Sequence, residues 1–202
     1  MRYVTVKKLN EYSVSMVDSK QEIMEATNEA LRKHSYSELS IQNIADEFEK
    51  SKSLLYHHYD GKDEILLEFM DFMLENFSEE VLSEEKESPE DALKRDAFMA
   101  FDSNHDCGIL KTLTELRTQG LRDERFQEKF HGLEKTYKER LEDLIRAGKE
   151  SNRFRESVDP EISAEFILAV NHEALHQKAA GREIVSLEKE LENYIESQIY
   201  RD

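Results

Sequence analysis

The chain has 202 residues, enough to bury a real core in one large domain or two modest ones. Its 45 acidic residues outnumber 28 basic ones, which gives a formal net charge of −17, and bulk Coulomb repulsion therefore opposes any approach to phosphate. The single cysteine, Cys107, excludes an internal disulfide framework, and no apolar run reaches the ~18 residues of a membrane span. We therefore expect a cytoplasmic protein with no membrane partner.

Residues 1–17 differ from the rest of the chain, because basic residues outnumber acidic ones there. The charged residues are Arg2, Lys7, Lys8 and Glu11. One interpretation is a basic arm that reaches a nucleic-acid backbone or minor groove. The other is a tail without fixed structure, and Met16 could then be the natural start.

Two amphipathic helices are predicted next. The first covers residues 19–34, with a capping box from Ser19 to Glu22 at its start. Its buried face carries Ile23, Ala26, Ala30 and Leu31. The second is short and follows Ser40. Its apolar side chains, spaced i, i+3, i+4 and i+7, are Ile41, Ile44, Ala45 and Phe48.

A third short helix begins after a tight turn and carries hydrogen-bond donors on one face. Leu55 and Tyr59, four residues apart, form its buried face. The opposite face carries Lys52, Ser53, Tyr56 and His57. So short a helix is not stable alone, and a scaffold must hold these donors outward. A short helix of this kind is typical of an element that enters a DNA major groove.

This stretch resembles the DNA-binding headpiece of the TetR family of transcriptional regulators, in which a helix-turn-helix ends in a Leu-Tyr-x-x-Phe pattern. Here the pattern reads Leu55-Tyr56-His57-His58-Tyr59, followed at the expected spacing by Lys62, Glu64 and Ile65. The resemblance implies a helix-turn-helix domain over residues 18–63. It implies DNA contacts from Ser40, Gln42, Ser51, Lys52, Ser53, Tyr56, His57, His58 and Lys62.

The same resemblance divides these contacts into two kinds. Gln42 and Lys52 would face base edges, where Gln can pair adenine and Lys can donate to guanine. Phosphate contacts would come from Ser40, Tyr56, His58 and Lys62. Ser53 and His57 could do either.

Two positions depart from the family pattern, and the charge balance is unfavourable. Glu49 stands where Gly is usual, and Leu54 replaces a hydroxyl residue. Residues 18–66 carry six basic against eleven acidic side chains, about −5 by count. Either such regulators tolerate an acidic surface, or the protein works in a salt-rich cytoplasm that screens the repulsion.

Beyond the headpiece the periodicity predicts helices only. Residues 65–81 are apolar nearly all round and suit a lever that joins headpiece to body. Ser88-Pro89 marks an N-cap and first helical position. Further helices are expected at 109–119 ending at Gly120, from Asp123 to a break over 148–158, from Asp159 to 180 ending at Gly181, and from Ser186 to 199. The fold class is all-α, with about nine helices, and residues 64–202 form a helical effector-binding and dimerisation domain.

The body also resembles the BetI-like regulatory domain of the same family. The segments that carry this likeness are Leu116-Arg-Thr-Gln-Gly-Leu-Arg-Asp-Glu and residues 153–164. The resemblance implies a homodimer in which the last two long helices of each subunit form a four-helix seam. The two apolar faces over 159–180 fit a helix that packs on its own core and on a partner. The seam candidates are Leu168, Leu175, His176, Leu187, Leu191 and Tyr194.

A ligand-responsive regulator, most simply a repressor, is the function that the resemblance implies. It would bind a palindromic operator in double-stranded DNA and respond to an unknown small-molecule effector. No cofactor is expected. The candidate pocket residues are Phe69, Met73, Phe101, His105, His131, Tyr137, Phe166 and His172.

One motif points elsewhere. His172-Glu173-Ala-Leu-His176 is an H-E-x-x-H pattern on a predicted helix, which in zinc proteases binds the metal and supplies a general base. Only 26 residues remain downstream for a third ligand, and Glu192 and Glu196 are the nominees. Seam or pocket packing is the competing interpretation, and we expect no enzyme. The alternatives are therefore a zinc-dependent hydrolase, a metal or pH sensor at His172 and His176, or a constitutive DNA-binding or scaffolding protein without an effector.

Overall fold

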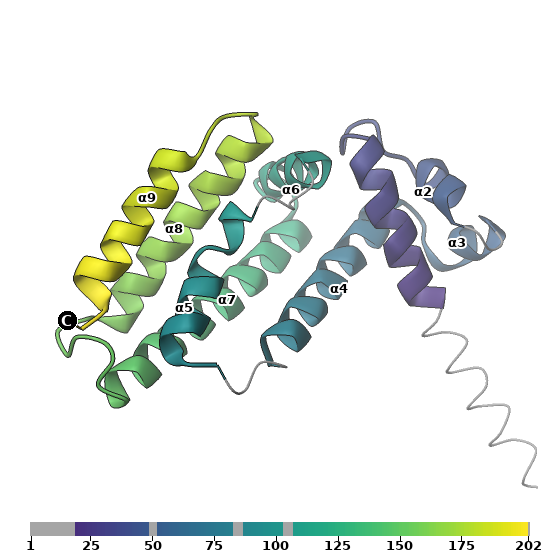
Figure 1. Ribbon diagram of the computed structural model, residues 1–202. Helices are drawn as coiled ribbons and strands as arrows, with labels where there is room; N and C mark the ends of the chain where they lie inside the picture. Colours follow the sequence, from purple (N-terminus) through teal and green to yellow (C-terminus); the bar gives the residue numbers. More distant parts are fainter. Residues whose placement is uncertain (1–18, 49–51, 83–86, 103–106, 202) are drawn as a thin grey trace, which may run out of the picture. The chain divides into compact units, whose positions relative to one another are not determined.

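The computed structural model describes residues 19–48, 52–82, 87–102 and 107–201, with the side chains of 54, 76–82 and 107–109 left out. Over these residues the regular elements are nine α-helices, a short 3₁₀-helix and a terminal π-helix (Figure 1). The all-α fold of about nine helices is therefore confirmed. The chain forms two compact units, Met1–Glu75 and Asn76–Asp202. The expected domain boundary after residue 63 stays a prediction, and the N-terminal arm, Ser51 and His105 lie outside the described residues.

The first unit is a small helical domain built around short elements. It contains a helix over residues 19–33, α2 (Ile41–Glu47), α3 (Lys52–His58) and the start of α4 (Lys62–Leu82). Its core side chains are at most 5% exposed: Ile23, Met24, Ala26, Ala30, Leu31, Leu39, Ile44, Ala45, Phe48, Leu55, Ile65, Leu66, Phe69 and Met70. The apolar faces expected for its first three helices are buried as predicted, apart from the half-buried Ile41 and Tyr59.

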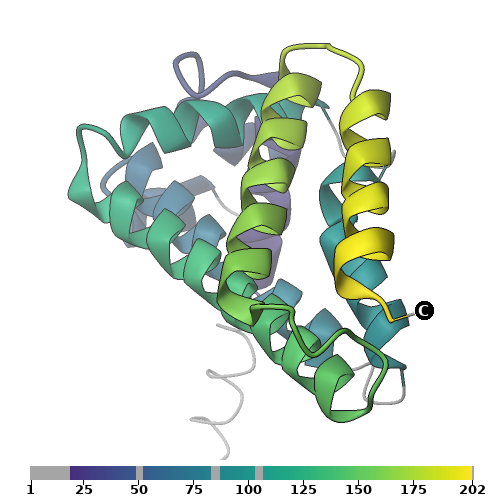
Figure 2. The same ribbon diagram turned by 90° about the vertical axis from the view of Figure 1, so that its left-hand side faces the viewer.

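The second unit is a bundle of longer helices. Its elements are α5 (Pro89–Ala97), η1 (Met99–Phe101), α6 (Cys107–Gln119), α7 (Glu124–Glu150), α8 (Pro160–Ala179), α9 (Val185–Tyr194) and η2 (Ile195–Ile199). Helix α8 packs against α6 and α7, and α8 and α9 lie side by side (Figures 1 and 2). One face of the α8–α9 pair is thus not covered by the other described elements of this unit (Figure 2).

Helix starts in this unit follow the signals in the sequence. Ser88 caps α5 by accepting from Asp91 N, with Pro89 at the first turn. Asp123 and Asp159 cap α7 and α8 in the same way. Gly181 follows the end of α8 with φ +70°, a conformation in which a side chain is strained. The last helix begins at Val185, one residue before the expected Ser186.

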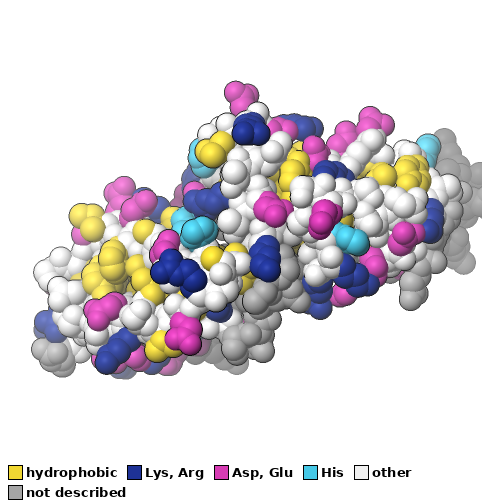
Figure 3. All heavy atoms as spheres, turned by 90° about the horizontal axis from the view of Figure 1, so that it is seen from above, with side chains coloured by type: hydrophobic (Ala, Val, Ile, Leu, Met, Phe, Trp, Pro, Cys, Tyr) yellow, Lys and Arg dark blue, Asp and Glu magenta, His cyan; other side chains and the backbone are white. Residues whose placement is uncertain are grey.

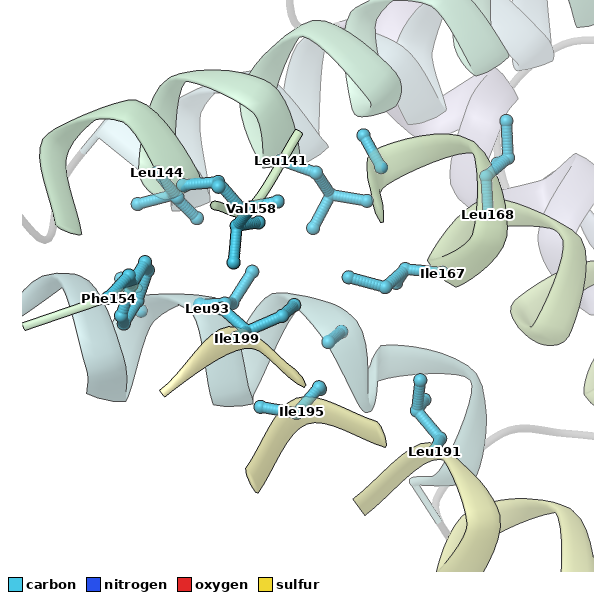
Figure 4. Packing of buried hydrophobic residues seen from close by; sticks show 14 of the residues in the cluster. Leu93, Leu141, Leu144, Phe154, Val158, Ile167, Leu168, Leu191, Ile195 and Ile199 are labelled. Carbon is cyan, nitrogen blue, oxygen red and sulfur yellow. The ribbon is translucent and has the colours of Figure 1, made fainter. Parts of the chain in front are cut away.

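The core of the second unit is apolar and formed by α5, α7, α8, α9 and η2 (Figure 4). Among the side chains that meet there are Leu93, Leu141, Leu144, Phe154, Val158, Ile167, Leu168, Leu191, Ile195 and Ile199. Complete burial of one such side chain contributes about 1.5–3 kcal/mol. The core therefore holds the last two helices to their own subunit before any partner is considered.

One buried polar side chain ties α8 to the chain around η1. Asn171 is 2% exposed, and its Oδ1 accepts from Ala100 N at 3.0 Å. Its Nδ2 donates to Ala97 O at 2.9 Å and to Ile167 O at 3.0 Å. Since each of these contacts satisfies a polar group in the interior, loss of the amide would leave the end of α5 and η1 with unpaired backbone groups.

The break expected over residues 148–158 is present but begins later, at Ser151, because α7 continues through Gly148 to Glu150. Glycine occurs inside this helix for a packing reason: a Cβ at position 148 would lie 2.1 Å from Cδ2 of Phe154. The Phe154 ring is 1% exposed and stacks on Tyr200 with ring centroids 5.3 Å apart. The isolated antiparallel bridge between Phe154 and Tyr200 holds the chain end at the same place. Gly148 therefore leaves room for the Phe154 ring to pack against α7, and it does not end the helix.

A substitution at Gly148 tests this packing. We expect Gly148→Ala to lower the free energy of unfolding by about 1–3 kcal/mol, because the new methyl group overpacks against a ring that is already enclosed. Urea titration followed by circular dichroism measures it. Gly132→Ala, in the same helix with nothing within 4 Å of its Cβ, is the matched control. It should stabilise the protein by about 0.5–1 kcal/mol, since glycine weakens a helix interior. Equal effects at both positions would contradict the packing explanation.

Candidate nucleic-acid interface

Helix α3 turns one face inward and the opposite face to solvent, as predicted. Leu55 is fully buried and anchors the helix to its unit. The exposed side chains are Lys52, Ser53, Tyr56, His57 and His58, and Tyr56 is 50% exposed despite its aromatic ring. A large exposed ring beside a hydroxyl, an ammonium group and two imidazoles forms a surface rich in donors.

Four of the exposed side chains on α2 and α3 are joined by hydrogen bonds, and we call them the Asp46 network. The Tyr56 hydroxyl donates to Gln42 Oε1 at 3.0 Å, and Gln42 Nε2 donates to Asp46 Oδ1 at 2.8 Å. The Lys52 ammonium group pairs with the same carboxylate oxygen. The hydrogen bond from Lys52, followed by that from Gln42, lowers the pKa of Asp46. Sequence reasoning singled out the other three members but missed Asp46, whose signal was its place four residues after Gln42.

Two further candidates have structural roles within the unit. Ser40 is the N-cap of α2, where its hydroxyl accepts from Asn43 N and the Asn43 side chain accepts from Ser40 N at 2.9 Å. Lys62 donates to Tyr36 O, and its ammonium group lies 4.2 Å from the centroid of the Tyr36 ring. The Tyr36 hydroxyl in turn donates to Asp63 Oδ1 at 3.2 Å. Lys62 is thereby held at the start of α4 rather than extended into solvent.

The departure from Phe to Tyr at the end of the motif is compensated. Tyr59 is half-buried, and its hydroxyl donates to Glu68. Burial, followed by that hydrogen bond, raises the pKa of Tyr59, so the ring stays neutral. Lys20 pairs with the same glutamate at 3.0 Å. A polar hydroxyl thus replaces the expected apolar edge without being left unpaired.

The lysine and arginine side chains that the structure describes in this unit contact acceptors in their own chain. Those that the structure describes, with their partners, are Lys20 with Glu68, Arg32 with Glu29, Lys33 with Glu47, Lys52 with Asp46 and Lys62 with Tyr36 O. On the face shown in Figure 3, acidic and basic side chains are interspersed over the coloured residues. The described basic side chains therefore form no strong positive field that would attract DNA. To bind DNA, they must exchange their acceptors in the chain for acceptors on the DNA.

The pocket candidates lie in several places. Phe69 is buried in the core of the first unit, and Met73 is half-buried on the next turn. In the second unit, Tyr137 belongs to the core, where its hydroxyl donates to Asp96 O at 2.7 Å, and Phe101 packs against that core. Phe166 and His131 are exposed. These side chains thus line no common cavity within either unit as described.

His172 has the most defined polar surroundings of these candidates. Its Nδ1 lies 3.3 Å from a guanidinium nitrogen of Arg117 on α6, and its Nε2 lies 3.6 Å from a carboxylate oxygen of Glu134 on α7. Arg117 and Glu134 pair at 2.6 Å. Burial first, and then the charge of Arg117, lowers the pKa of His172, although Glu134 opposes the shift.

The H-E-x-x-H pattern does not gather into a metal centre. Glu173 is exposed and accepts from Gln177 Nε2 at 2.7 Å, and His176 is exposed one turn beyond His172. Within the described parts of the chain, no three His, Cys, Asp or Glu side chains lie close enough to hold a metal ion. The structure therefore gives no support to the zinc-hydrolase interpretation.

Helix α8 has the two faces that the sequence predicts, but they are assigned differently. The seam candidates Leu168 and Leu191 lie in the subunit's own core, Leu175 and Leu187 are half-buried, and His176 is exposed. Tyr194 lies on α9 with its ring 4.4 Å from that of Phe166. The large apolar side chains left exposed on these helices are Ile162 at 67%, Phe166 at 42% and Val185 at 68%.

Ile162 and Phe166, with exposed Ala169, form one stripe along α8, which we call the α8 stripe. The stripe lines a groove of about 440 Å³ together with Lys138, Glu161 and Glu165. Lys138 pairs with Glu165 at 2.7 Å, so a charged pair borders the apolar floor. An apolar stripe with a charged rim is typical of a surface that contacts another protein.

Comparison with known proteins agrees with this architecture. Residues 23–69 match the family model for bacterial regulatory proteins of the tetR family. A TetR transcription regulator from Haloarcula marismortui ATCC 43049 is 28% identical, with 91% of this chain and 99% of that chain covered and a TM-score of 0.82. A comparison with curated proteins found no match.

Two more distant solved structures share the fold. One is a putative transcriptional regulator from Saccharomonospora viridis in complex with choline, 17% identical, with coverage of 92% and 100% and a TM-score of 0.79. The other is the transcriptional regulator FadR from Bacillus subtilis in complex with stearoyl-CoA, 19% identical, with coverage of 89% and 99% and a TM-score of 0.66.

Fold and headpiece together resemble those of helical, DNA-binding regulators. Residues 23–69 match the tetR family model, and the fold of the described residues is similar to that of a solved TetR transcription regulator. The BetI-like character of the body stays a prediction. None of the helices in the described residues has the length and hydropathy that crossing a bilayer requires.

The surroundings of His172 predict a pH dependence of stability. Its pKa in the folded protein is lowered from 6.5, so the folded state binds a proton there less readily than the unfolded chain. This contribution to stability is present above the unfolded value and is lost as the pH falls through the folded value. We expect His172→Gln to remove it, so that wild type loses more stability than the variant between about pH 7.5 and 5.5.

The exposed His176 gives the matched control for that measurement. His176→Gln removes a histidine one turn along the same helix, where the side chain is 64% exposed. Its unfolding free energy should keep the wild-type slope between the two pH values. A His172→Gln variant with the wild-type slope would show that Arg117 and burial do not disfavour the charged imidazole.

Proposed function

We propose that this protein is a ligand-responsive transcriptional repressor that binds a palindromic operator as a homodimer. The observation that carries the proposal is the donor-rich outer face of α3, held in place by the complete burial of Leu55 on its inner face. A short helix presented in this way fits the width of a DNA major groove. The family match over residues 23–69 supports the same assignment.

In this proposal the exposed candidates divide by the chemistry that they offer. Gln42 and Lys52 would face base edges, and Tyr56 and His58 would contact phosphates. Lys62 would approach phosphate from the N-terminus of α4, a position that favours anions. Because Lys52 and Lys62 already have acceptors within the chain, binding replaces those contacts with contacts to DNA.

The dimer in this proposal uses the open face of α8 and α9. The α8 stripe supports it, since exposed apolar side chains at 67% and 42% are costly to leave in water. A two-fold axis through such a seam would present two recognition helices to half-sites about one DNA turn apart, ~34 Å. This geometry is the reason for expecting a palindromic operator.

The effector in this proposal is a small molecule that binds within the second unit. Relatives with this fold are in complex with choline and with stearoyl-CoA, two ligands of very different chemistry. The side chains of His172, Arg117 and Glu134 contact one another in the second unit, and this polar cluster is the site at which we expect the effector to be recognised. A ligand there changes DNA affinity only by its differential affinity for two arrangements of the protein. Native mass spectrometry of the purified protein would identify a ligand that is carried through purification.

The acidic composition supports a protein that works at high salt. The net charge of −17 and the likeness to a Haloarcula regulator point the same way. At molar salt the Debye length is about 3 Å, so repulsion between the headpiece and phosphate is largely removed. Local contacts of the Asp46 network would then decide affinity.

DNA binding is tested with a double substitution on the outer face of α3. We expect Lys52→Ala with Tyr56→Ala to abolish genomic occupancy in cells and to weaken binding to recovered fragments at least about ten-fold, since each direct contact is worth about 1–3 kcal/mol. Chromatin immunoprecipitation with sequencing, then fluorescence anisotropy, measure the two effects. Titrations at about 0.1 M and 2 M KCl add the salt dependence, and retained affinity at the higher salt supports the high-salt interpretation.

The matched control removes a lysine from the other unit. Lys135 is 75% exposed on α7, and Lys135→Ala makes the same change of charge as Lys52→Ala. Its occupancy and affinity should equal those of wild type. Unchanged occupancy of the double variant in cells would contradict the proposed DNA-binding surface.

The homodimer is tested on the α8 stripe. We expect Phe166→Glu to convert the dimer into a monomer, because a carboxylate cannot be buried unpaired in an apolar seam. Size-exclusion chromatography with light scattering gives the mass directly. Leu121→Glu is the matched control, since Leu121 is 82% exposed in the turn between α6 and α7, and its mass should not change. A dimeric Phe166→Glu variant would place the seam elsewhere.

A further inference from the structure

The Asp46 network joins both helices of the helix-turn-helix on its outer surface. Gln42 and Asp46 lie four residues apart on α2, while Lys52 and Tyr56 lie four residues apart on α3. Each side chain is exposed, so no burial in the core fixes its position. The hydrogen bonds between them are therefore what gives these four groups a defined arrangement.

The amide of Gln42 receives a different partner at each end. An amide oxygen accepts two hydrogen bonds, and an amide nitrogen donates two. Tyr56 could serve either end, because a hydroxyl both donates and accepts. An ionised carboxylate only accepts, so Asp46 requires the Nε2 end to face it, as it does at 2.8 Å. Asp46 is thus the member of the network that selects the orientation of the amide.

The charge of Asp46 is maintained by its partners. Lys52 pairs with the carboxylate, and this contact, together with that of Gln42, lowers the pKa of Asp46. The carboxylate is therefore ionised at neutral pH and keeps its strict demand for a donor. Once Lys52 exchanges this contact for DNA, a neutral amide at position 46 could turn either its oxygen or its nitrogen toward Gln42 and would no longer select one orientation.

The orientation of this amide matters for reading a base. Glutamine pairs adenine through one acceptor and one donor in a fixed order. Asp46 holds one N–H of Gln42 and leaves the other for a base edge, while Oε1 supplies the acceptor once Tyr56 exchanges its contact there for phosphate. Reversal of the amide exchanges donor and acceptor, and the adenine pairing is lost. An aspartate also repels phosphate, so a gain in overall affinity cannot explain this residue.

We propose that Asp46 is a positioning residue that holds the Gln42 amide in one orientation and so sets the sequence preference of the headpiece at one base pair. It acts through Gln42 and does not itself contact a base. Its charge lowers the affinity for DNA of any sequence, and selectivity is what it contributes. This inference rests on the proposed DNA-binding function and adds the residue that decides specificity.

The test is selection of binding sites from randomised duplex DNA by the full chain and its variants. Wild type should select adenine at one position of each half-site. In Asp46→Asn the preference for adenine over the other bases at that position should fall about ten-fold, which is the discrimination expected of one bidentate pair. Binding of Asp46→Asn to unrelated DNA should become about two-fold tighter, the effect in water of one charge at ~10 Å. Gln42→Ala should lose the same preference, and adding Asp46→Asn to it should change the preference no further.

A control separates the orientation of the amide from the change of net charge. Glu29→Gln removes the same charge from the first helix, where Glu29 pairs with Arg32 at 3.4 Å and has no part in the network. It should leave the selected sequence unchanged. Thermal unfolding of Asp46→Asn should match that of wild type, because Asp46 is exposed.

The possible results distinguish the inference from the function on which it rests. If wild type selects no sequence, the proposed DNA-binding function fails, and the inference fails with it. If wild type selects a site and Asp46→Asn keeps the full preference, the function stands and the inference is overturned. If Asp46→Asn still shifts the preference in the Gln42→Ala background, Asp46 contacts a base itself and the positioning role is overturned.

Discussion

The burial of Leu55 beneath α3 is the interaction on which the functional surface depends. A helix of seven residues has too few internal hydrogen bonds to form alone in water. Its stability comes from the core of the first unit, in which Leu55, Ile44 and Leu66 are all fully buried. Because one face of α3 is buried, Lys52, Tyr56 and their neighbours on the opposite face are exposed to solvent. The positions of the proposed DNA contacts on α3 follow from this apolar anchor.

The acidic composition changes how such a surface can work. In the first unit the described basic side chains are held by acceptors of the same chain, so no strong positive field precedes contact with DNA. The free energy of binding must then come from exchanging one set of short polar contacts for another. Such an exchange is sensitive to the geometry of each donor and less sensitive to salt than a purely electrostatic one. Selectivity is easier to achieve under these conditions than affinity, which is consistent with a carboxylate that positions a side chain proposed to contact a base.

The parts of the fold that depend on local chemistry could be predicted from the sequence, and those that depend on distant contacts could not. Helix ends are determined by residues close to them in the sequence, as the caps at Ser88, Asp123 and Asp159 and the end of α8 before Gly181 show. Gly148 was misleading because its neighbour, Phe154, packs on it only in the folded chain. Asp46 was overlooked because its role depends on contacts with side chains of α3, a different helix from its own. The open face of α8 could not be told from its buried face, since both carry apolar residues at helical spacing.

Helix α8 connects these observations within the second unit. Asn171 and His172 are consecutive and point to different neighbours: the first binds the end of α5 and η1, and the second lies against Arg117 of α6 and Glu134 of α7. The α8 stripe faces outward from the same helix. A close-packed interior transmits a displacement rather than absorbing it. A ligand that moves α8 near His172 must therefore also move η1 through Asn171 and shift the outward stripe, so a binding event in the body reaches the proposed seam through one rigid element.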